Sequence, residues 1–556
     1  MQVDEVATPR QLADRYVEEL ADLNPVIGTA LGIRPGNDAL PDYSPDGLEA
    51  RASAQRAVLA ELQVLDGPDL PVVERRAARL LRERLTATLA IHDDGENLRE
   101  VDNLFSPPQT LRSVFLLMPA DTEDDWAAIA RRLRNVPRAA RSYRASLDEG
   151  MSRGLLAAPR QVETVIEQLT SWIEARWYAD FVSAGPEGLK QELSTAAAVA
   201  SEALAELRDY FAQTYAPAAA GVPDAVGRER YARWARYWTG SELDLEDAYA
   251  YGWSEYHRLR QEMVEAAEAI RPGASPQDVM QHLDEHGEVI EGAEEMRRWL
   301  QHLMDGAMAD LDGAYIDLAE PIKQVEAMIA PPGGAAAPYY TRPSLDFSRP
   351  GRTWLPTLGK QRFPTWSVVS TWYHEGVPGH HFQFAQWVYL QDQLSRYQVS
   401  VGSVSAMTEG WALYAERLMD ELGYLTDPAY RLGYLDAQML RAVRVIIDIG
   451  MHLELPIPGH SEFHPGATWT PELGREFLSR NCGRGQEFVD SEIVRYLGRP
   501  GQAISYKLGE RAWLEGRAAA RKARGADFNL KDWHMASLSL GSLGLDDLAD
   551  ELARLP

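Results

Sequence analysis

The sequence predicts an all-α, mostly helical protein, and two patterns support this prediction. Apolar residues recur at every fourth position from Val73 to Leu89, with arginine and glutamate between them, which is typical of an amphipathic helix facing a core. Similar helical patterns extend around residues 122–150, 159–183, 190–215, 244–271 and 293–311. Alternating patterns typical of strands are scarce, and only 339–340 and 353–355 predict a small β ribbon near 339–356.

The chain of 556 residues is interpreted as one large unit, 1–556, with three candidate lobes. Stretches rich in proline and glycine at 216–223, 330–343 and 455–472 predict long connections between helices. They indicate an N-terminal helical lobe (1–215), a middle helical segment (224–329) and a C-terminal lobe (330–556). Seven of the 12 histidines follow residue 373, which directs the search for chemistry to the last lobe.

Composition excludes several classes of function. The chain carries 83 acidic and 56 basic residues, a net charge of −27, which disfavours nucleic acid and anionic membranes as partners. Cys482 is the only cysteine, so neither an intrachain disulfide nor a four-cysteine zinc site can form. No apolar run reaches the roughly 18 residues of a membrane span, and the first residues do not resemble a signal peptide. We therefore expect a cytoplasmic protein.

A sequence similar to a zinc-binding motif begins at His374. In the His-Glu-x-x-His motif, two histidines one helical turn apart bind the metal and the glutamate activates water. Here Pro378 occupies the second position, and the next histidines are His380 and His381. On a regular helix His381 returns to within about 20° of His374 but lies roughly 10 Å along the axis, whereas a bulge at 378–379 would bring His380 into place. The spacing leaves open which of the two binds metal and which supports the site.

A third ligand is expected on a following helix. Glu409 lies 35 residues after His374 and is the candidate ligand. Glu416 is two helical turns further along the same face. It would orient a histidine, or pair with Arg417 or Arg441.

The helical segment 441–452 carries Arg444, Asp448 and His452 at four-residue steps. One interpretation is an internal ion-pair network that holds two helices together. The other is that Asp448 orients His452, which then donates a hydrogen bond to a developing oxyanion. The sequence favours neither.

Further candidates lie near the C-terminus. A helix expected to begin at Pro500 places Gln502 and Tyr506 on one face, where Gln502 would contact substrate and Tyr506 would donate to a tetrahedral intermediate. The alternative for Tyr506 is a core tyrosine with a satisfied hydroxyl. His534 is another candidate, although a buried core histidine is the plainer interpretation.

Several of these segments resemble the bacterial domain-of-unknown-function family 885. The matching motifs are H-E-G-V-P-G-H-H-F-Q at 374–383, E-G-W-A-L-Y-A-E at 409–416, R-A-V-R-V-I-I-D-I-G-M-H at 441–452 and P-G-Q-A-I-S-Y-K-L-G at 500–509. The resemblance implies a helical protein related to the zinc metallopeptidases. It also implies an architecture similar to the helical zinc carboxypeptidases and oligopeptidases, which enclose their site in a central cleft or channel.

The expected function is a zinc-dependent hydrolase, an intracellular exopeptidase or oligopeptidase. Zn²⁺ would be held by His374, Glu409 and one or both of the paired histidines, and Glu375 would act as general base. The candidate donors to the oxyanion are Tyr506, His452 and His534, and the candidate carboxylate-binding residues are Arg444, Arg349 and Arg352.

Two other functions stay open at this point. One is a metal hydrolase acting on a non-peptide amide or ester, since the same chemistry serves those bonds. The other is a non-catalytic helical binding or scaffold protein whose altered motif holds no metal. Substrate profiling would identify the first, and the metal content of the purified protein would identify the second.

Overall fold

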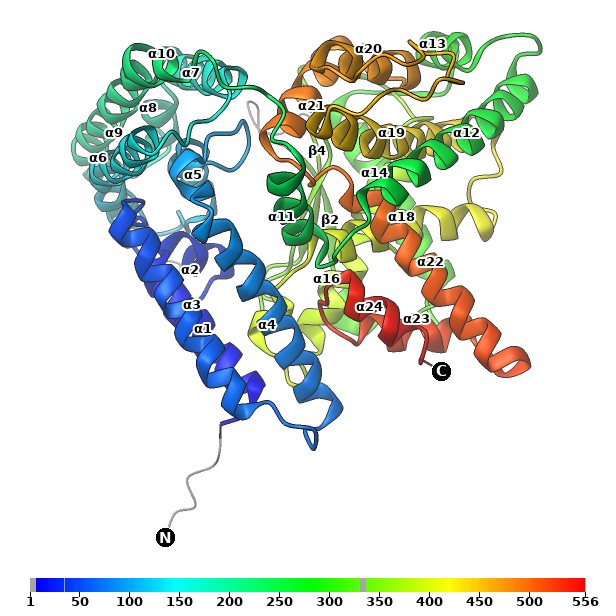
Figure 1. Cartoon of the computed structure of the whole chain (residues 1–556), viewed down its shortest axis with the longest axis horizontal. Coiled ribbons are helices and arrows are strands. Elements are labelled where there is room, and N and C mark those ends of the chain that lie inside the picture. The colour runs from blue at the N-terminus through cyan, green and yellow to red at the C-terminus, as the bar shows by residue number, and fades with distance from the viewer. Residues whose placement is uncertain (1–6, 35, 331–336, 556) are drawn as a thin grey trace. The chain divides into compact units, whose positions relative to one another are not determined.

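The computed structural model describes residues 7–34, 36–330 and 337–555. The chain forms two compact units, Met1–Val226 with Leu497–Arg499, and Gly227–Tyr496 with Pro500–Pro556. Helices dominate both, so the predicted mostly helical fold is confirmed (Figure 1). The three lobes expected from the proline- and glycine-rich stretches stay a prediction.

The first unit is a set of packed helices. α6 packs along α9 around a core that includes Leu133, Val165 and Leu204, and α3 packs along α4. Its helices are α1 (Pro9–Leu23), α2 (Pro25–Leu31), α3 (Pro45–Leu65), α4 (Val72–Asp93), α5 (Pro107–Ser113), α6 (Glu123–Ser152), α7 (Pro159–Glu174), α8 (Trp177–Val182), α9 (Lys190–Tyr210) and α10 (Ala216–Ala219), with 3-10 turns at Glu96–Arg99, Val114–Leu117 and Glu187–Leu189 and a π turn at Phe211–Tyr215.

Two local predictions for this unit need correction. The helix expected over 159–183 is two helices, because Arg176 adopts a left-handed conformation with φ of 52° and interrupts it. The stretch 216–223, expected to be a connection, begins with the helical turn α10. Pro217 is compatible with that turn because it lies in the first turn, where a missing N–H costs little.

The second unit contains the remaining helices and all five strands of the described chain. Its helices are α11 (Arg228–Thr239), α12 (Leu245–Ile270), α13 (Pro276–His286), α14 (Ala293–Leu311), α15 (Val369–Glu375), α16 (His380–Tyr389), α17 (Arg396–Val399), α18 (Ser405–Glu421), α19 (Pro428–Leu453), α20 (Pro471–Asn481), α21 (Gln486–Gly498, which ends in the first unit), α22 (Ser505–Arg524), α23 (Leu530–Leu538) and α24 (Leu545–Leu552), with 3-10 turns at Glu320–Lys323 and Gly525–Asp527. Among the described helices, none is long and apolar enough to cross a membrane.

The strands form two small sheets. β4 (Gly351–Leu355) lies between β2 (Val325–Ile329), which is parallel to it, and β3 (Tyr339–Thr341), which is antiparallel. β1 (Val289–Glu291) pairs with β5 (Arg362–Pro364). The expected ribbon is therefore present as β3 and β4. Part of the connection expected at 330–343 is strand β3, and residues 331–336 of it lie outside the described residues.

Helix α19 is the central element of the second unit. Every residue from Leu432 to His452 is buried, because α12, α15, α18, α20 and α22 all pack against it. A helix enclosed on all sides is expected to be apolar all round, yet α19 carries Asp436, Arg441, Arg444 and Asp448. Buried charges of this kind require partners, and these partners define much of the site described next.

Candidate functional site

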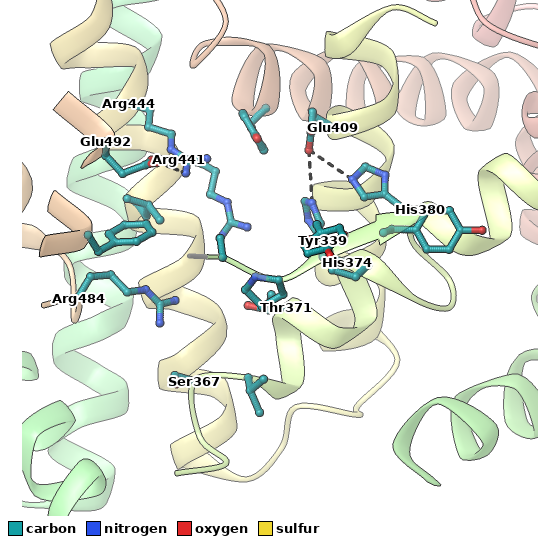
Figure 2. Close-up of a pocket in the computed structure, with 18 of the residues that line it drawn as sticks. Tyr339, Ser367, Thr371, His374, His380, Glu409, Arg441, Arg444, Arg484 and Glu492 are labelled. Carbon is teal, nitrogen blue, oxygen red and sulfur yellow. Dashed lines mark hydrogen bonds and ion pairs between the residues drawn. The ribbon is translucent and has the colours of Figure 1, made fainter. Parts of the chain in front are cut away.

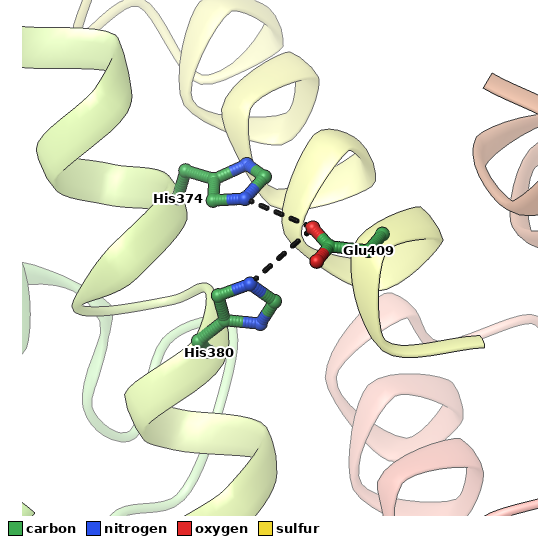
Figure 3. A group of neighbouring side chains, drawn as sticks. All are labelled: His374, His380 and Glu409. Carbon is green, nitrogen blue, oxygen red and sulfur yellow. Dashed lines mark ion pairs between the residues drawn. The ribbon is translucent and has the colours of Figure 1, made fainter. Parts of the chain in front are cut away.

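Three side chains from three helices converge on one point. His374 lies at the end of α15, His380 begins α16, and Glu409 lies in the first turns of α18. His374 Nε2 and His380 Nε2 lie 3.4 Å and 3.5 Å from Glu409 Oε2. Figure 3 shows both rings directed at this carboxylate. The structure thus brings together the predicted metal ligands, with His380 as the second histidine.

The turn between α15 and α16 makes this convergence possible. It spans residues 376–379, and a side chain at Gly379 would collide with the carbonyl oxygens of His374 and Tyr373, so only glycine fits there. Trp411 Nε1 donates to Pro378 O at 2.9 Å and to Gly379 O at 3.2 Å. Since Trp411 follows Glu409 by two residues in α18, the same helix supplies the carboxylate and fixes the turn.

The donor types and the two distances to Glu409 Oε2 suit a tetrahedral zinc ion. Histidine nitrogen and carboxylate oxygen bind Zn²⁺ at about 2.0–2.2 Å, which places neighbouring donors about 3.3–3.6 Å apart. One donor atom from each of the three residues lies within 4.8 Å of the other two. Within the described residues, Glu409 Oε2 is buried without a hydrogen-bond partner. A buried carboxylate oxygen left in this way is costly unless a cation binds it, so the residues fit a metal.

Glu416 supports His374 from the side opposite Glu409. Its Oε1 accepts a hydrogen bond from His374 Nδ1 at 2.8 Å, and its Oε2 accepts one from the Ser370 hydroxyl. Arg441 Nη2 lies 3.7 Å from the same Oε1. Glu416 thus contacts a histidine and Arg441, two of the partners expected for it. A carboxylate behind a ligand histidine fixes its orientation and leaves Nε2 available for metal.

The cluster is electrostatically coupled. Burial alone would raise the pKa of Glu409, but the ion pairs with His374 and His380 outweigh it, so this pKa lies well below its ordinary value. Burial lowers the pKa of His374, but Glu409, Glu416 and Glu375 outweigh that effect and raise it to about 9. With its pKa raised, His374 holds a proton beside these carboxylates. Metal binding would therefore release protons.

His381 faces away from the cluster. Its Nε2 lies 2.6 Å from Ile322 O, which can only accept, so Nε2 carries the proton and Nδ1 accepts from the Tyr340 hydroxyl at 2.9 Å. Burial lowers the pKa of His381 to about 4 and keeps it neutral. Both ring nitrogens are used, and His381 therefore supports strand β3.

A cavity of about 510 Å³ lies beside the cluster. Glu375 and Tyr506 line it together with His374, His380 and Glu409. Burial raises the pKa of Glu375 above its ordinary value. No described residue forms a hydrogen bond with the Glu375 carboxylate, which leaves it available to a molecule in the cavity. Figure 2 shows the three cluster residues on one side of the pocket, and Arg441, Arg444 and Arg484 on the other.

Asp448 and His452 lie outside the cavity lining. Asp448 Oδ2 accepts hydrogen bonds from the Tyr231 hydroxyl at 2.7 Å and from Gly501 N at 3.0 Å. His452 Nε2 donates to Tyr496 O at 3.0 Å and lies 3.9 Å from Asp448 Oδ1. These contacts tie α19 to α11, α21 and the turn before α22 through hydrogen bonds to a tyrosine hydroxyl and to backbone groups. Gly501 has φ of +77° and approaches Ala235 closely, which requires glycine.

Four further candidates also lie outside the cavity lining. His534 donates from Nδ1 to Tyr315 O and accepts at Nε2 from the Tyr414 hydroxyl, the arrangement of a core histidine. Arg352 pairs with Glu326 at 2.8 Å, and Arg349 donates to Arg342 O at 3.2 Å. Gln502 is half-buried and does not reach the cavity.

Arg444 does line the cavity, but it is already paired. Its Nη2 donates to Glu492 Oε2 at 2.7 Å and its Nε to the Tyr496 hydroxyl at 2.8 Å. Its guanidinium lies 4.6 Å from the ring centroid of Tyr506, which positions that tyrosine. The sequence interpretation missed Arg484 and Arg495 as lining residues, because only tertiary structure brings residues 484–495 beside α19. Polar residues on a buried helix are the signal that points to Arg441.

Comparison with known proteins identifies the family. The model of a family described as "Bacterial protein of unknown function (DUF885)" matches residues 25–552. The chain belongs to this family. No curated protein matches the DUF885 chain significantly.

Two solved structures share the fold of this DUF885 protein. One is described as the "putative lipoprotein from Colwellia psychrerythraea", with a TM-score of 0.83, 22% identity and 98% of each chain covered. The other is a "putative lipoprotein of unknown function from Shewanella oneidensis", with a TM-score of 0.76 and 16% identity, covering 98% of this chain and 99% of that one. At these identities the likeness shows the fold alone.

Proposed function

We propose that this DUF885 protein is a zinc-dependent hydrolase that cleaves peptide bonds. The observation that carries the proposal is the convergence of His374 Nε2, His380 Nε2 and Glu409 Oε2 next to Glu375 on the wall of one cavity. Two histidines and a glutamate leave one position of a tetrahedral ion open, which distinguishes catalytic from structural zinc sites.

The residues around the cluster would divide the reaction between them. Zinc held there would polarise a substrate carbonyl and lower the pKa of water to about 7. Glu375 would accept a proton from the attacking water at its carboxylate and deliver it to the leaving amine. Tyr506 would donate its hydroxyl proton in a hydrogen bond to the developing oxyanion. Glu416 would hold His374 in place throughout.

Metal content tests the site. The protein is purified without added zinc and then dialysed, first against a zinc-containing buffer and then against a zinc-free one. Elemental analysis should find close to one equivalent of bound zinc. His374→Ala and Glu409→Ala should each bind far less, since each removes one of three protein ligands. A wild-type protein without stoichiometric metal would favour the binding or scaffold function.

Substrate cleavage tests the role of Glu375. Glu375→Gln should keep the metal and the fold and lose activity by about 10²-fold or more, because it removes the general base and no ligand. Glu265→Gln, an exposed position on α12, is the matched control and should keep full activity. Blocked peptides, amides and esters should be assayed side by side. Hydrolysis of esters or non-peptide amides alone would assign a different substrate, and wild-type activity in Glu375→Gln would exclude this residue as the base.

A further inference from the structure

Four arginines line the wall of the cavity opposite His374, His380 and Glu409. Arg441 and Arg444 project from α19, Arg484 from the segment before α21, and Arg495 from α21; together they are the arginine wall. Figure 2 shows three of them facing the cluster across the pocket. In a chain with a net charge of −27, such a concentration of positive charge on one wall of a cavity requires an explanation.

Two of the four arginines share one carboxylate. Glu492 Oε2 accepts from Arg444 Nη2 at 2.7 Å and from Arg495 Nη2 at 2.8 Å. The Tyr496 hydroxyl donates to the same oxygen. Glu492 thus serves both guanidinium groups, although Arg495 Nε is buried without a hydrogen-bond partner among the described residues.

The other two arginines are under-partnered. Arg441 is only 7% exposed, and the one hydrogen bond that it donates to a described residue runs from Nη1 to the backbone oxygen of Ala437 at 2.9 Å. Its Nε is buried without a partner among the described residues, and the nearest carboxylate, Glu416, is 3.7 Å away and already bound to His374. In the part of the chain that the structure describes, Arg484 has one ion pair, to Asp436 at 3.5 Å. A buried guanidinium without a close anion is costly, so the wall is suited to an anion supplied from the cavity.

We propose that the arginine wall binds a free carboxylate of the substrate through Arg441 and Arg484, so that the scissile carbonyl lies at the cluster of His374, His380 and Glu409. This inference rests on the proposed hydrolase function and names its substrate class. The planar guanidinium offers paired donors that match the two oxygens of a carboxylate. Two sources share this chemistry, the C-terminal α-carboxylate of a peptide and an acidic side chain. The first would make the enzyme a carboxypeptidase.

Binding can be tested separately from turnover. In the full-length Glu375→Gln protein, isothermal titration calorimetry should compare acetyl-Ala-Ala-Ala-Phe as free acid and as C-terminal amide. Hydrogen bonds to charged groups predict that the acid binds about 10- to 100-fold more tightly. Equal affinity, or no binding of the acid, overturns the proposal. An amide ending in glutamate separates the sources, because it binds like the acid only if a side-chain carboxylate suffices.

Substitutions locate the carboxylate on the wall. Arg441→Gln and Arg484→Gln should each weaken binding of the free acid about tenfold or more and leave the affinity for the amide unchanged. Arg441→Lys retains the charge without the fork and should be intermediate if it folds. Arg431→Gln, on α19 but outside the cavity, should bind both peptides as the parent does. An equal loss of affinity for the acid and the amide would mean that these arginines stabilise the structure and do not bind the carboxylate.

Hydrolysis by the wild-type protein separates the two proposals. Cleavage of the acid with a kcat/KM at least tenfold above that of the amide supports both. Equal cleavage of the two peptides overturns the carboxylate inference and leaves the hydrolase intact. Selective binding of the acid without hydrolysis of either peptide supports the arginine wall and overturns the peptidase function.

Discussion

His380 and His381 are adjacent in the chain, but their rings belong to different parts of the structure. His380 presents Nε2 to Glu409, while His381 is held between Ile322 O and the Tyr340 hydroxyl. Neighbouring side chains on a helix point about 100° apart, so one residue can bind metal while the next supports a strand. We infer that the first of the pair is the ligand.

Single substitutions of the two histidines should therefore differ. His380→Ala should lose most of its zinc with little loss of stability, because it removes a ligand. His381→Ala should retain zinc but lower the free energy of unfolding by about 1–3 kcal/mol, since it leaves Ile322 O and the Tyr340 hydroxyl without their hydrogen-bond partner. Elemental analysis and urea unfolding monitored by tryptophan fluorescence measure the two effects. Greater zinc loss in His381→Ala would reverse the assignment.

Residue identity and spacing predicted His374, Glu409 and Glu416 as parts of one cluster. They could not choose between His380 and His381, because that choice depends on the path of the backbone at 376–379. The path is set by contacts to Trp411 Nε1, which lies 32 residues after Gly379. Helical periodicity contains no information about such a contact.

The helices that carry Glu409 and Tyr506 touch through glycine. In α18, a side chain at Gly410 would collide with the backbone of Gly509 in α22. A side chain at Gly509 would equally collide with Ala406 O. The two helices therefore approach more closely than any larger residue allows, and this approach places Glu409 and Tyr506 around the same cavity.

Gly410→Ala should separate these helices. We expect the free energy of unfolding to fall by about 1–3 kcal/mol, with reduced zinc content because Glu409 is the preceding residue. Gly306→Ala in α14 is the matched control, since nothing lies within 4 Å of its added methyl group. It should gain up to about 1 kcal/mol from helix propensity. Urea unfolding compares the two, and an equal response would remove the special role of this contact.

Element prediction succeeded where a helix has one apolar face and failed where backbone conformation decides. The expected helices at 122–150, 244–271 and 293–311 correspond to α6, α12 and α14. The interruption at Arg176 has no counterpart in the apolar pattern. Strand β2 is a five-residue stretch that periodicity alone cannot separate from a buried helical turn.

At the scale of the whole molecule, buried ionisable groups outside the cavity lining affect stability in opposite directions. Burial lowers the pKa of His534 to about 4 and raises the pKa of Asp448 to about 7. His534 therefore favours the folded state above its ordinary pKa, and this contribution is lost as the pH falls toward 4. Asp448 contributes below its ordinary pKa, and its contribution is lost as the pH rises through 7.

Two substitutions should show opposite pH dependence. The stability lost in His534→Gln should shrink by at most roughly 1.4 kcal/mol per pH unit as the pH falls from about 6.5 to 4. The stability lost in Asp448→Asn should instead shrink as the pH rises from about 4 to 7. Urea titrations of both variants and the wild type at several pH values measure this. Parallel curves for wild type and variants would contradict these assignments.

The arginine wall could not be predicted from local sequence patterns, because its residues are distant in the sequence. Arg441 and Arg484 are 43 positions apart and meet only when α19 and the segment before α21 pack together. Charged residues on a helix buried all round indicate that partners must exist. They do not say whether those partners come from the protein or from a ligand.

The turn at 376–379 also bears on how related sites are found in other sequences. Without Pro378 and Gly379 the sequence would be His-Glu-Gly-Val-His, which has the spacing of the His-Glu-x-x-His motif used to search for zinc hydrolases. The second histidine here lies two residues further along the chain than that motif allows, so a search with fixed spacing does not find this site. A query that accepts His-Glu, four further residues and His, with a glutamate 29 positions later, retrieves this chain. Each sequence retrieved can then be checked for a tryptophan two positions after that glutamate.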